Sequence, residues 1–381
     1  MILPEVPDVT DYAERFHSEK KSRFEDRYDE ILEDIGPDQI RPSIQSKISL
    51  EQEHVDLIRA VSSGFHQDKN ALGSSSGFKF TFVNPLVEQY HGHQTNGYEL
   101  DIGADVLLAR TREFSRVQLC VVACEVDDSN VPQWIENINE IHETFNDPDN
   151  QDQILSQIGA GSRTLDQIQY ITLVKPEDYD ELQFGEINTR CNPSEFAIWT
   201  AEMNGSSQIC YEDGEIIHKE LLDVIEDCFD YDVRENPIEY SVDTDPVIPL
   251  QNVIFRLVRG KDIYEDSDEP LEFTRSEFKQ KYSEKLNLGV PKSEYDKMID
   301  SLTTTLLNLG ERIGIFSQDD TKLDVSDYRI MYRGSDDAKT AEDAVREKYV
   351  DEAAENQSKV EAFTRVKEEF DSGQSGLGDF Q

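Results

Sequence analysis

The sequence has 381 residues, enough for two or three domains. It carries 80 acidic and 37 basic residues, a formal net charge of −43, with 9% aromatic residues. Recurrent apolar strand-like runs and this aromatic content exclude a disordered chain, and no apolar stretch approaches the roughly 18–20 residues of a membrane span.

Acidic residues occur in every part of the chain rather than in one tail. Molar salt screens charge repulsion to within a few ångströms, so a cell interior full of salt tolerates such a surface. The composition therefore resembles that of a protein from a halophilic archaeon, with an acidic mesophilic protein as the alternative. The five cysteines form no CxxC pair, their number is odd and we see no signal peptide. We expect core thiols, a cytoplasmic protein and no membrane partner.

The chain begins with a polar helical arm over residues 1–49, with helical character over 11–35. A second helix is predicted after Ser49, which is placed as its N-cap with Gln52 completing a capping box. Val55, Ile58 and Val61 would form its buried stripe.

Residues 50–235 alternate between strand and helix patterns. We predict helix 130–145 and a hairpin at Asn204-Gly205, with strands over 78–83, 98–109, 117–127 and 168–174, and we interpret residues 84–97 as a loop. This order predicts an α/β domain, a mixed sheet with helices on its faces.

Residues 236–270 are rich in proline near their start and are interpreted as a linker. Residues 271–334 then follow the order helix, turn, helix, hairpin, which is that of a winged helix-turn-helix domain. Residues 271–333 hold 10 basic and 11 acidic residues, nearly neutral in a very acidic chain. DNA contacts are predicted at Lys292, Lys297, Arg329 and Arg333. A protein-interaction module is the alternative.

Residues 335–381 are predicted to be a charged helical tail. Their apolar residues recur at helical spacing, which is typical of a docking face or a homodimer face. The members of this stripe are Val345, Tyr349, Val360, Phe363, Val366 and Phe370.

Four carboxylates follow the two central strand patterns. Asp101 and Asp105 are four apart on the first, so they share one face of it; Glu125 and Asp127 are two apart on the second and share a face there. If the strands are neighbours, these groups converge, and uncompensated carboxylates require a cation or a proton. The pattern therefore predicts a divalent-metal site, whereas ordinary halophilic surface charge is the alternative.

The order of elements over roughly 50–174 resembles the core of the PD-(D/E)XK nuclease superfamily. This order is a helix, a strand with Asp105, a strand with Glu125, a helix and a strand. The resemblance implies a restriction-endonuclease-like fold and Mg²⁺ or Mn²⁺ bound by Asp101, Asp105 and Glu125. Asp105, Glu125 and Asp127 would be the catalytic residues. Glu53 matches an acidic helix residue of some members.

One departure concerns the family's Glu-x-Lys motif, in which the lysine helps to hold the attacking water. Asp127 stands where that lysine is expected, so Lys79 or Lys175 would have to replace it. Two hypotheses follow: a Mg²⁺-dependent nuclease acting on DNA, in defence or repair, or an inactive nuclease-like scaffold that binds DNA or protein. The pair His91 and His93 has no cysteine spaced to complete a zinc site and is interpreted as part of a surface loop.

Overall fold

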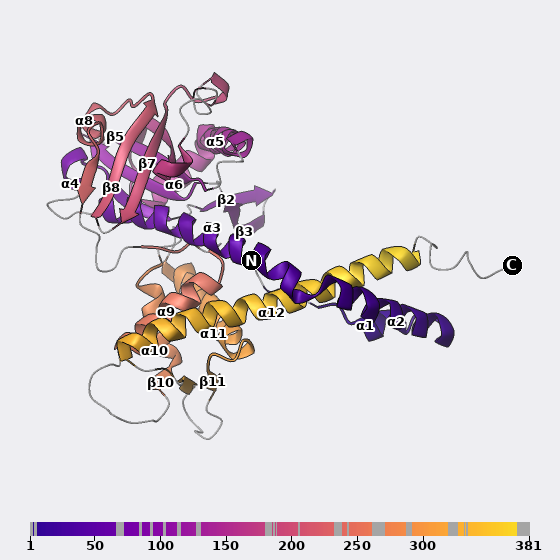
Figure 1. The fold of residues 1–381 in the computed structure, drawn as a ribbon. Coiled ribbons are helices and arrows are strands. Elements are labelled where there is room, and N and C mark those ends of the chain that lie inside the picture. The colour runs from indigo at the N-terminus through magenta and orange to yellow at the C-terminus, as the bar shows by residue number, and fades with distance from the viewer. Residues whose placement is uncertain are drawn as a thin grey trace. The chain divides into compact units, whose positions relative to one another are not determined.

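The computed structural model describes residues 3, 6–65, 72–83, 86–91, 94–101, 104–112, 116–126, 131–179, 185, 187, 189–204, 206–231, 238–241, 244–260, 271–286, 292–318, 327–330, 332 and 334–371. They form a mixed α/β protein with one seven-stranded sheet, one three-stranded sheet and one two-stranded sheet (Figure 1). The chain divides into two compact units, one of 50–244 and 276–304, the other of 1–49, 245–275 and 305–381.

The first of these units contains the seven-stranded sheet. The middle strands β5, β6 and β7 are parallel, whereas β1, β4, β8 and β9 each pair antiparallel with their neighbours. In spatial order the strands are β1 Lys79–Val83, β4 Val106–Arg112, β5 Arg116–Cys124, β6 Thr164–Val174, β7 Phe196–Asn204, β8 Ser206–Gly214 and β9 Phe229–Tyr231.

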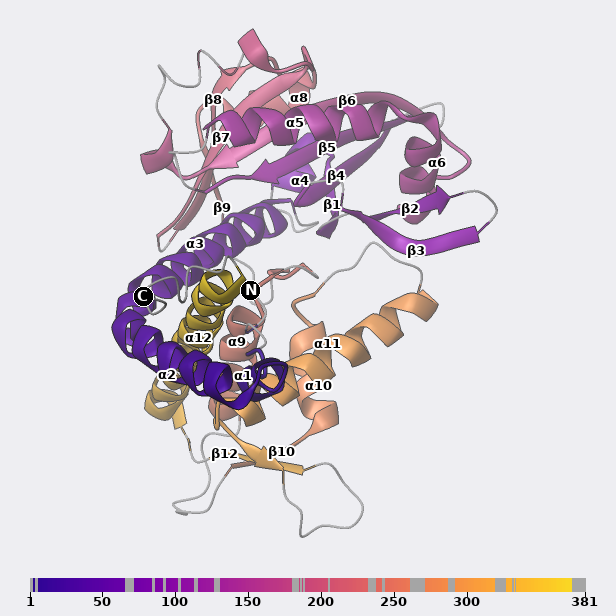
Figure 2. The same ribbon diagram turned by 90° about the vertical axis from the view of Figure 1, so that its right-hand side faces the viewer.

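Helices cover both faces of this sheet (Figure 2). One face packs against α5 Val131–Asn146 and α6 Pro148–Gln157. The other packs against α4 Leu72–Ser76, α8 Lys219–Ile225 and the last turns of α3 Pro37–Gly64. The α5 residues Trp134, Ile138, Ile141 and Phe145 are all buried, as their helical spacing requires. The predicted mixed sheet with helices on its faces is confirmed.

The predicted single strand over 98–109 is wrong. Residues up to Asp101 belong to β3 Gln94–Asp101, which pairs with β2 Leu86–His91, and β4 begins only at Val106. The expected loop over 84–97 therefore contains β2 and the start of β3. The side chain of His91, and His93 altogether, lie outside the described residues. Period-2 alternation alone could not show that one apolar run serves two sheets.

The N-cap predicted at Ser49 is also wrong, because Ser49 lies in the middle of α3 and its hydroxyl donates to the carbonyl of Gln45. Ile40, Ile44 and Ile48 are buried at a spacing of four residues, so the apolar stripe begins well before Ser49. Because this stripe is buried, the helix continues through Ser49, although serine is a common N-cap residue.

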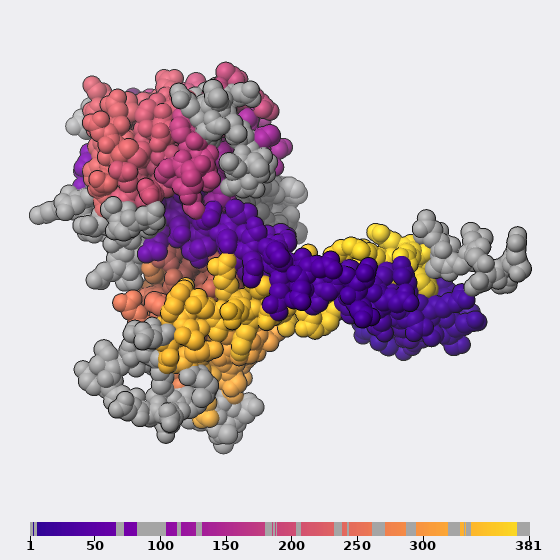
Figure 3. Space-filling model, in the orientation of Figure 1, coloured from indigo at the N-terminus to yellow at the C-terminus, as the bar shows by residue number. Residues whose placement is uncertain are grey.

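The second unit is mainly helical. Its helices α1 Val9–Ala13 and α2 Ser18–Ile35 pack beside α12 Gly334–Asp371, with the indigo and yellow side chains in contact in Figure 3. The ring of Phe24 lies 5.1 Å from that of Phe370. Val345, Tyr349 and Val366 are fully buried, so the apolar stripe expected to dock a partner is covered by this chain itself. The 236–270 segment, expected as a linker, contains the buried helix α9 Val247–Gly260.

The expected winged-helix segment forms, in chain order, β10 Leu271–Thr274, α10 Arg275–Ser283, α11 Lys292–Arg312, β11 Ser317–Gln318 and β12 Asp327–Ile330. The strands pair in the order β10-β12-β11. No helix among the described residues is long and apolar enough to cross a membrane.

The cysteines divide into two groups. Cys120 and Cys124 are buried free thiols, as expected, and Cys191 is a half-buried free thiol. Cys210 and Cys228 form a disulfide, which the sequence interpretation did not anticipate. The two cysteines are adjacent to the paired residues Ile209 of β8 and Phe229 of β9, so the strand pairing brings them opposite each other.

Gly214 ends β8 at a φ of +100°, and a Cβ there would overlap the carbonyl oxygen of Phe196 and lie 2.7 Å from Cα of Ala197. We expect Gly214→Ala to lower the free energy of unfolding by about 2–5 kcal/mol through strain and overpacking. Urea denaturation in molar KCl measures the loss. Gly159→Ala is the matched control, because Gly159 also has positive φ (+71°) but nothing within 4 Å of its Cβ position; equal losses in the two variants would contradict the steric argument.

Candidate functional site

Asp105 lies one residue before β4, where its backbone N–H donates to the carbonyl of Val122 on β5 at 3.0 Å. Its carboxylate is part-buried and both oxygens are engaged. Oδ2 accepts from the backbone N–H of Cys124 at 2.6 Å, and Oδ1 lies 2.7 Å from Nε2 of His54 on α3. The start of one strand, the end of the next and a helix thus meet at this carboxylate.

His54 supplies the positive charge beside Asp105. Burial by itself would lower the pKa of His54. The charge and hydrogen bond of Asp105, together with the charges of Glu51 and Glu125, outweigh burial and raise the pKa to about 9. The imidazole is therefore protonated at neutral pH and forms a salt bridge with Asp105.

Glu125 follows the last residue of β5, and its backbone N–H donates to the carbonyl of Leu173 on β6 at 2.9 Å. Its Oε1 accepts a hydrogen bond from Asn137 Nδ2 on α5 at 3.0 Å. Burial, and after it the charge of Asp105, raise the pKa of Glu125 to about 7, despite the opposing effects of Asn137 and His54. Asp105 and Glu125 therefore interact electrostatically, as convergent carboxylates do.

Lys175 follows β6 directly and forms an ion pair with Glu53 of α3, with 3.1 Å between Nζ and Oε1. β5 and β6 run parallel with Cys124 opposite Leu173, so Glu125 and Lys175 both lie just beyond the same ends of neighbouring strands. Lys79 is exposed on β1, which pairs with β4 and not with β5. Of the two lysines considered for the role of the missing family lysine, the geometry favours Lys175.

The other predicted site residues are only partly described. Asp127 and Arg333, and the side chains of Asp101 and Lys292, lie outside the described residues. Lys297 is exposed on α11. Arg329 on β12 forms an ion pair with Glu272 of the paired strand at 3.3 Å. Its guanidinium is thus engaged within the three-stranded sheet.

Two residues of the site were missed from sequence, His54 and Asn137. His54 comes directly after Glu53, the helix residue that the resemblance had singled out. Its position beside Glu53 was the one feature of the sequence that could have indicated His54 as a site residue. Asn137 carried no signal, because an amide on a helix surface has no distinctive pattern.

The donor chemistry of the site fits a hard cation. Asp105 and Glu125 offer carboxylate oxygens on neighbouring strands, and Mg²⁺ commonly takes one or two protein carboxylates while keeping several waters. Burial raises the pKa of the Cys124 thiol well above its usual value, which disfavours a thiolate ligand here. Within the described part of the chain no group of three or more His, Cys, Asp or Glu residues is arranged to hold a metal ion.

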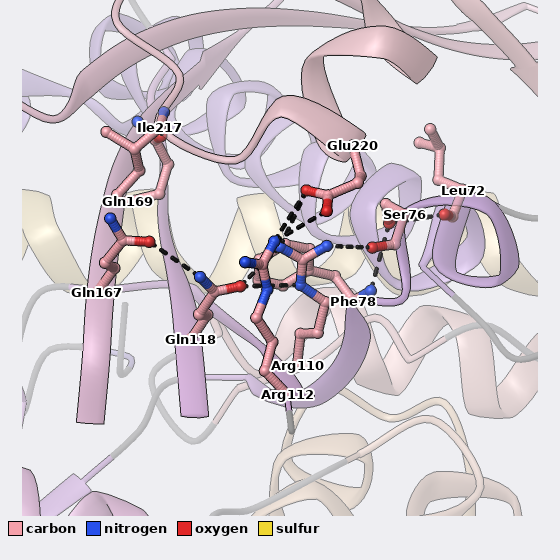
Figure 4. A network of polar contacts seen from close by, with 10 residues as sticks. All are labelled: Leu72, Ser76, Phe78, Arg110, Arg112, Gln118, Gln167, Gln169, Ile217 and Glu220. Atoms are coloured by element: carbon pink, nitrogen blue, oxygen red, sulfur yellow. Dashed lines mark hydrogen bonds and ion pairs between the residues drawn. The ribbon is translucent and has the colours of Figure 1, made fainter. Parts of the chain in front are cut away.

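A second polar cluster in the same unit surrounds Arg110 of β4 (Figure 4). The buried guanidinium donates to Gln118 and to the carbonyl of Ser76, at 2.6 and 2.9 Å, and lies 3.3 Å from Glu220 of α8. Gln118 donates in turn to Gln167 of β6 at 2.9 Å. Arg110 is thus fully engaged in holding α4 and α8 against the sheet, which is a structural role.

Comparison of the chain with protein-family models, curated proteins and solved structures gave no match.

The raised pKa of Glu125 predicts a pH-dependent stability. The folded state holds its proton up to about pH 7 and the unfolded state only to about 4.5, so this stabilisation is complete below about pH 4.5 and lost as pH rises through 7. In metal-free buffer, we expect Glu125→Gln to raise the free energy of unfolding by about 1–3 kcal/mol at about pH 8, with little gain at about pH 4.5.

Denaturant unfolding at the two pH values measures this difference. Glu140→Gln is the control, because its side chain is exposed on α5. A gain for Glu125→Gln that is the same at both pH values would show that ionisation of Glu125 is not its cause.

Proposed function

We propose that the protein is a metal-dependent nuclease that cleaves DNA, with Asp105 and Glu125 as ligands of Mg²⁺ or Mn²⁺. The observation that carries the proposal is the meeting of two part-buried, interacting carboxylates from neighbouring strands, with Lys175 just beyond the adjacent parallel strand. Phosphodiester hydrolysis needs a hard cation to neutralise the phosphate and to lower the pKa of a bound water. Carboxylates on strand ends provide a rigid base for it.

The order of the elements supports the PD-(D/E)XK resemblance. Helix α3, the antiparallel strands β1, β4 and β5, then helix α5 and the parallel strand β6 follow in the expected sequence. In this proposal Lys175 takes the part of the family's lysine and holds the attacking water, while Glu53 positions the Lys175 amine. Asp101 and Asp127 keep their proposed supporting roles.

The C-terminal elements support a DNA-guiding winged helix. A strand, two helices and two further strands that pair as β10-β12-β11 provide a helix pair followed by a wing. The exposed Lys297 of α11 would contact phosphate with Lys292. Arg333 would act from the wing, and Arg329 would do so by exchanging its ion pair with Glu272 for one with phosphate. A cytoplasm of a halophilic archaeon remains the proposed setting, although the Cys210–Cys228 disulfide is uncommon in a reducing compartment.

An inactive nuclease-like scaffold that binds DNA or protein is the second candidate. Two observations favour it: Asp127 stands in place of the expected lysine, and both oxygens of Asp105 are engaged by protein groups. Metal binding without cleavage would identify this alternative.

The nuclease proposal predicts that Mg²⁺ and Mn²⁺ bind in molar KCl and that the loaded protein nicks plasmid DNA. Calorimetric titration and a nicking assay measure the two properties. We expect Glu125→Ala to abolish both, and Lys175→Met to retain metal binding while lowering the nicking rate at least a hundredfold. Lys79→Met is the matched lysine control and should nick like the wild type. Nicking that survives in Glu125→Ala would refute the assignment of the site.

The winged-helix proposal predicts salt-dependent binding to duplex DNA. Replacing both Lys292 and Lys297 with alanine removes two phosphate contacts. The slope of log affinity against log salt should then become shallower by about 2. Fluorescence anisotropy across a KCl series measures the slope. Lys339→Ala, a control whose side chain is 63% exposed on α12, should leave it unchanged; an unchanged slope in the double variant would place the DNA surface elsewhere.

A further inference from the structure

The strand β6 has a neighbour on only one side along its first half. It pairs with β5 from Thr164 onward, but β7 begins at Phe196 opposite Tyr170. Among the described residues, no strand pairs with the other edge of β6 between Thr164 and Gln169. Six strand residues span about 20 Å, so this edge is long enough to pair with a short extended segment.

A pocket of about 290 Å³ lies beside this open edge. Its walls come from the ends of α5 and α6, from β6, from Glu195 just before β7 and from Ile217 just before α8. The pocket therefore occupies the region into which a longer β7 would extend. It lies toward the start of β6, at the opposite end of the strand from Lys175, so it is separate from the proposed nuclease site.

The lining residues give the pocket an acidic character. Asp166 and Glu195 contribute carboxylates, and the lining contains no lysine or arginine, so that His142 is its one residue of a basic type. Asp166 is neutralised by Arg116 at 3.2 Å, whereas no ion pair to the Glu195 carboxylate occurs among the described residues. The surface that the pocket presents is therefore mainly polar, although Leu165, Ile168 and Ile217 are among the residues around it.

The side chain of Gln169 limits how far an added strand could extend. Its Nε2 donates to the carbonyls of Glu195 and Glu215 at 2.8 and 2.9 Å. Its Oε1 accepts from the backbone N–H of Ile217 at 3.0 Å, and both of these residues are drawn in Figure 4. These bonds hold the residues at the point where the unpaired part of the β6 edge ends and β7 begins. The edge before Gln169 is left with its backbone groups open on that side among the described residues.

We propose that the free edge of β6 binds an extended peptide segment of a protein partner, as an added strand that places a basic side chain in the adjoining pocket beside Glu195. Backbone hydrogen bonds along the edge would supply affinity, and the pocket would select the side chain. Charge complementarity commits the proposal to lysine or arginine, since Glu195 is the carboxylate in the pocket that lacks an ion pair among the described residues. The open backbone edge favours a peptide over a free amine.

The test uses the labelled peptide Ac-TVTRTVT-NH2 and the full-length protein in molar KCl, with binding measured by fluorescence anisotropy. We expect it to bind, and we expect at least tenfold weaker binding of Ac-TVTQTVT-NH2 and of the arginine peptide methylated on alternate backbone nitrogens. Glu195→Gln should weaken binding of the arginine peptide about tenfold. Glu140→Gln, which removes an equal charge from the exposed face of α5 outside the pocket, should not.

Three results would overturn the proposal. The first is no binding of the arginine peptide at about 1 mM, a concentration that corresponds to a marginal association. The second is equal binding of the methylated peptide or of acetyl-arginine amide, which would mean that the pocket takes a free cation and the edge contributes nothing. The third is a dimer in light scattering that the peptide does not dissociate, which would assign the edge to a second copy of the chain.

Discussion

The parallel pairing of β5 with β6 is the constraint on which the proposed chemistry depends. It holds Glu125 and Lys175 just beyond the same ends of two strands, because Cys124 and Leu173 are opposite each other. A parallel pair needs a long connection, and α5 and α6 provide it while burying one face of the sheet. The same connection brings Asn137 to Glu125. This strand pairing therefore sets one face of the core and places Glu125, Lys175 and Asn137, whereas Asp105 and His54 are placed by β4 and α3.

The site concentrates charge where the surrounding core is apolar. Asp105 is stabilised by the imidazolium of His54 and by a backbone N–H. Glu125 instead accepts a hydrogen bond from a neutral amide, that of Asn137, and its pKa is raised. A buried carboxylate with a raised pKa lowers stability when it ionises, and such groups are concentrated at functional sites. The contrast between these two carboxylates is the strongest physical sign that this end of the sheet does more than hold the fold together.

Local patterns predicted the sheet domain well. The spacing of Trp134, Ile138 and Ile141 identified α5 and its buried face, and Asn204-Gly205 identified the β7–β8 hairpin. Long-range facts were not predictable. The division of the apolar run 98–109 between two sheets, the pairing of His54 with Asp105, and the Cys210–Cys228 disulfide each depend on residues that only the tertiary fold brings together. The apolar stripe of α12 was recognised. A periodic pattern does not show whether the residues that pack against such a stripe belong to the same chain or to a partner.

The helical unit has a consequence for synthesis on the ribosome. It combines residues 1–49 with 305–381, and α2 packs against α12, although Ile35 and Gly334 are 299 positions apart (334 − 35 = 299). At about 5–20 residues per second, the first helices wait on the order of 15–60 s before their partner emerges. During that interval Phe24, which is fully buried in the finished protein, lacks its cover. The nascent chain therefore exposes aromatic surface for most of its translation, and this protein is one for which a holding chaperone would matter.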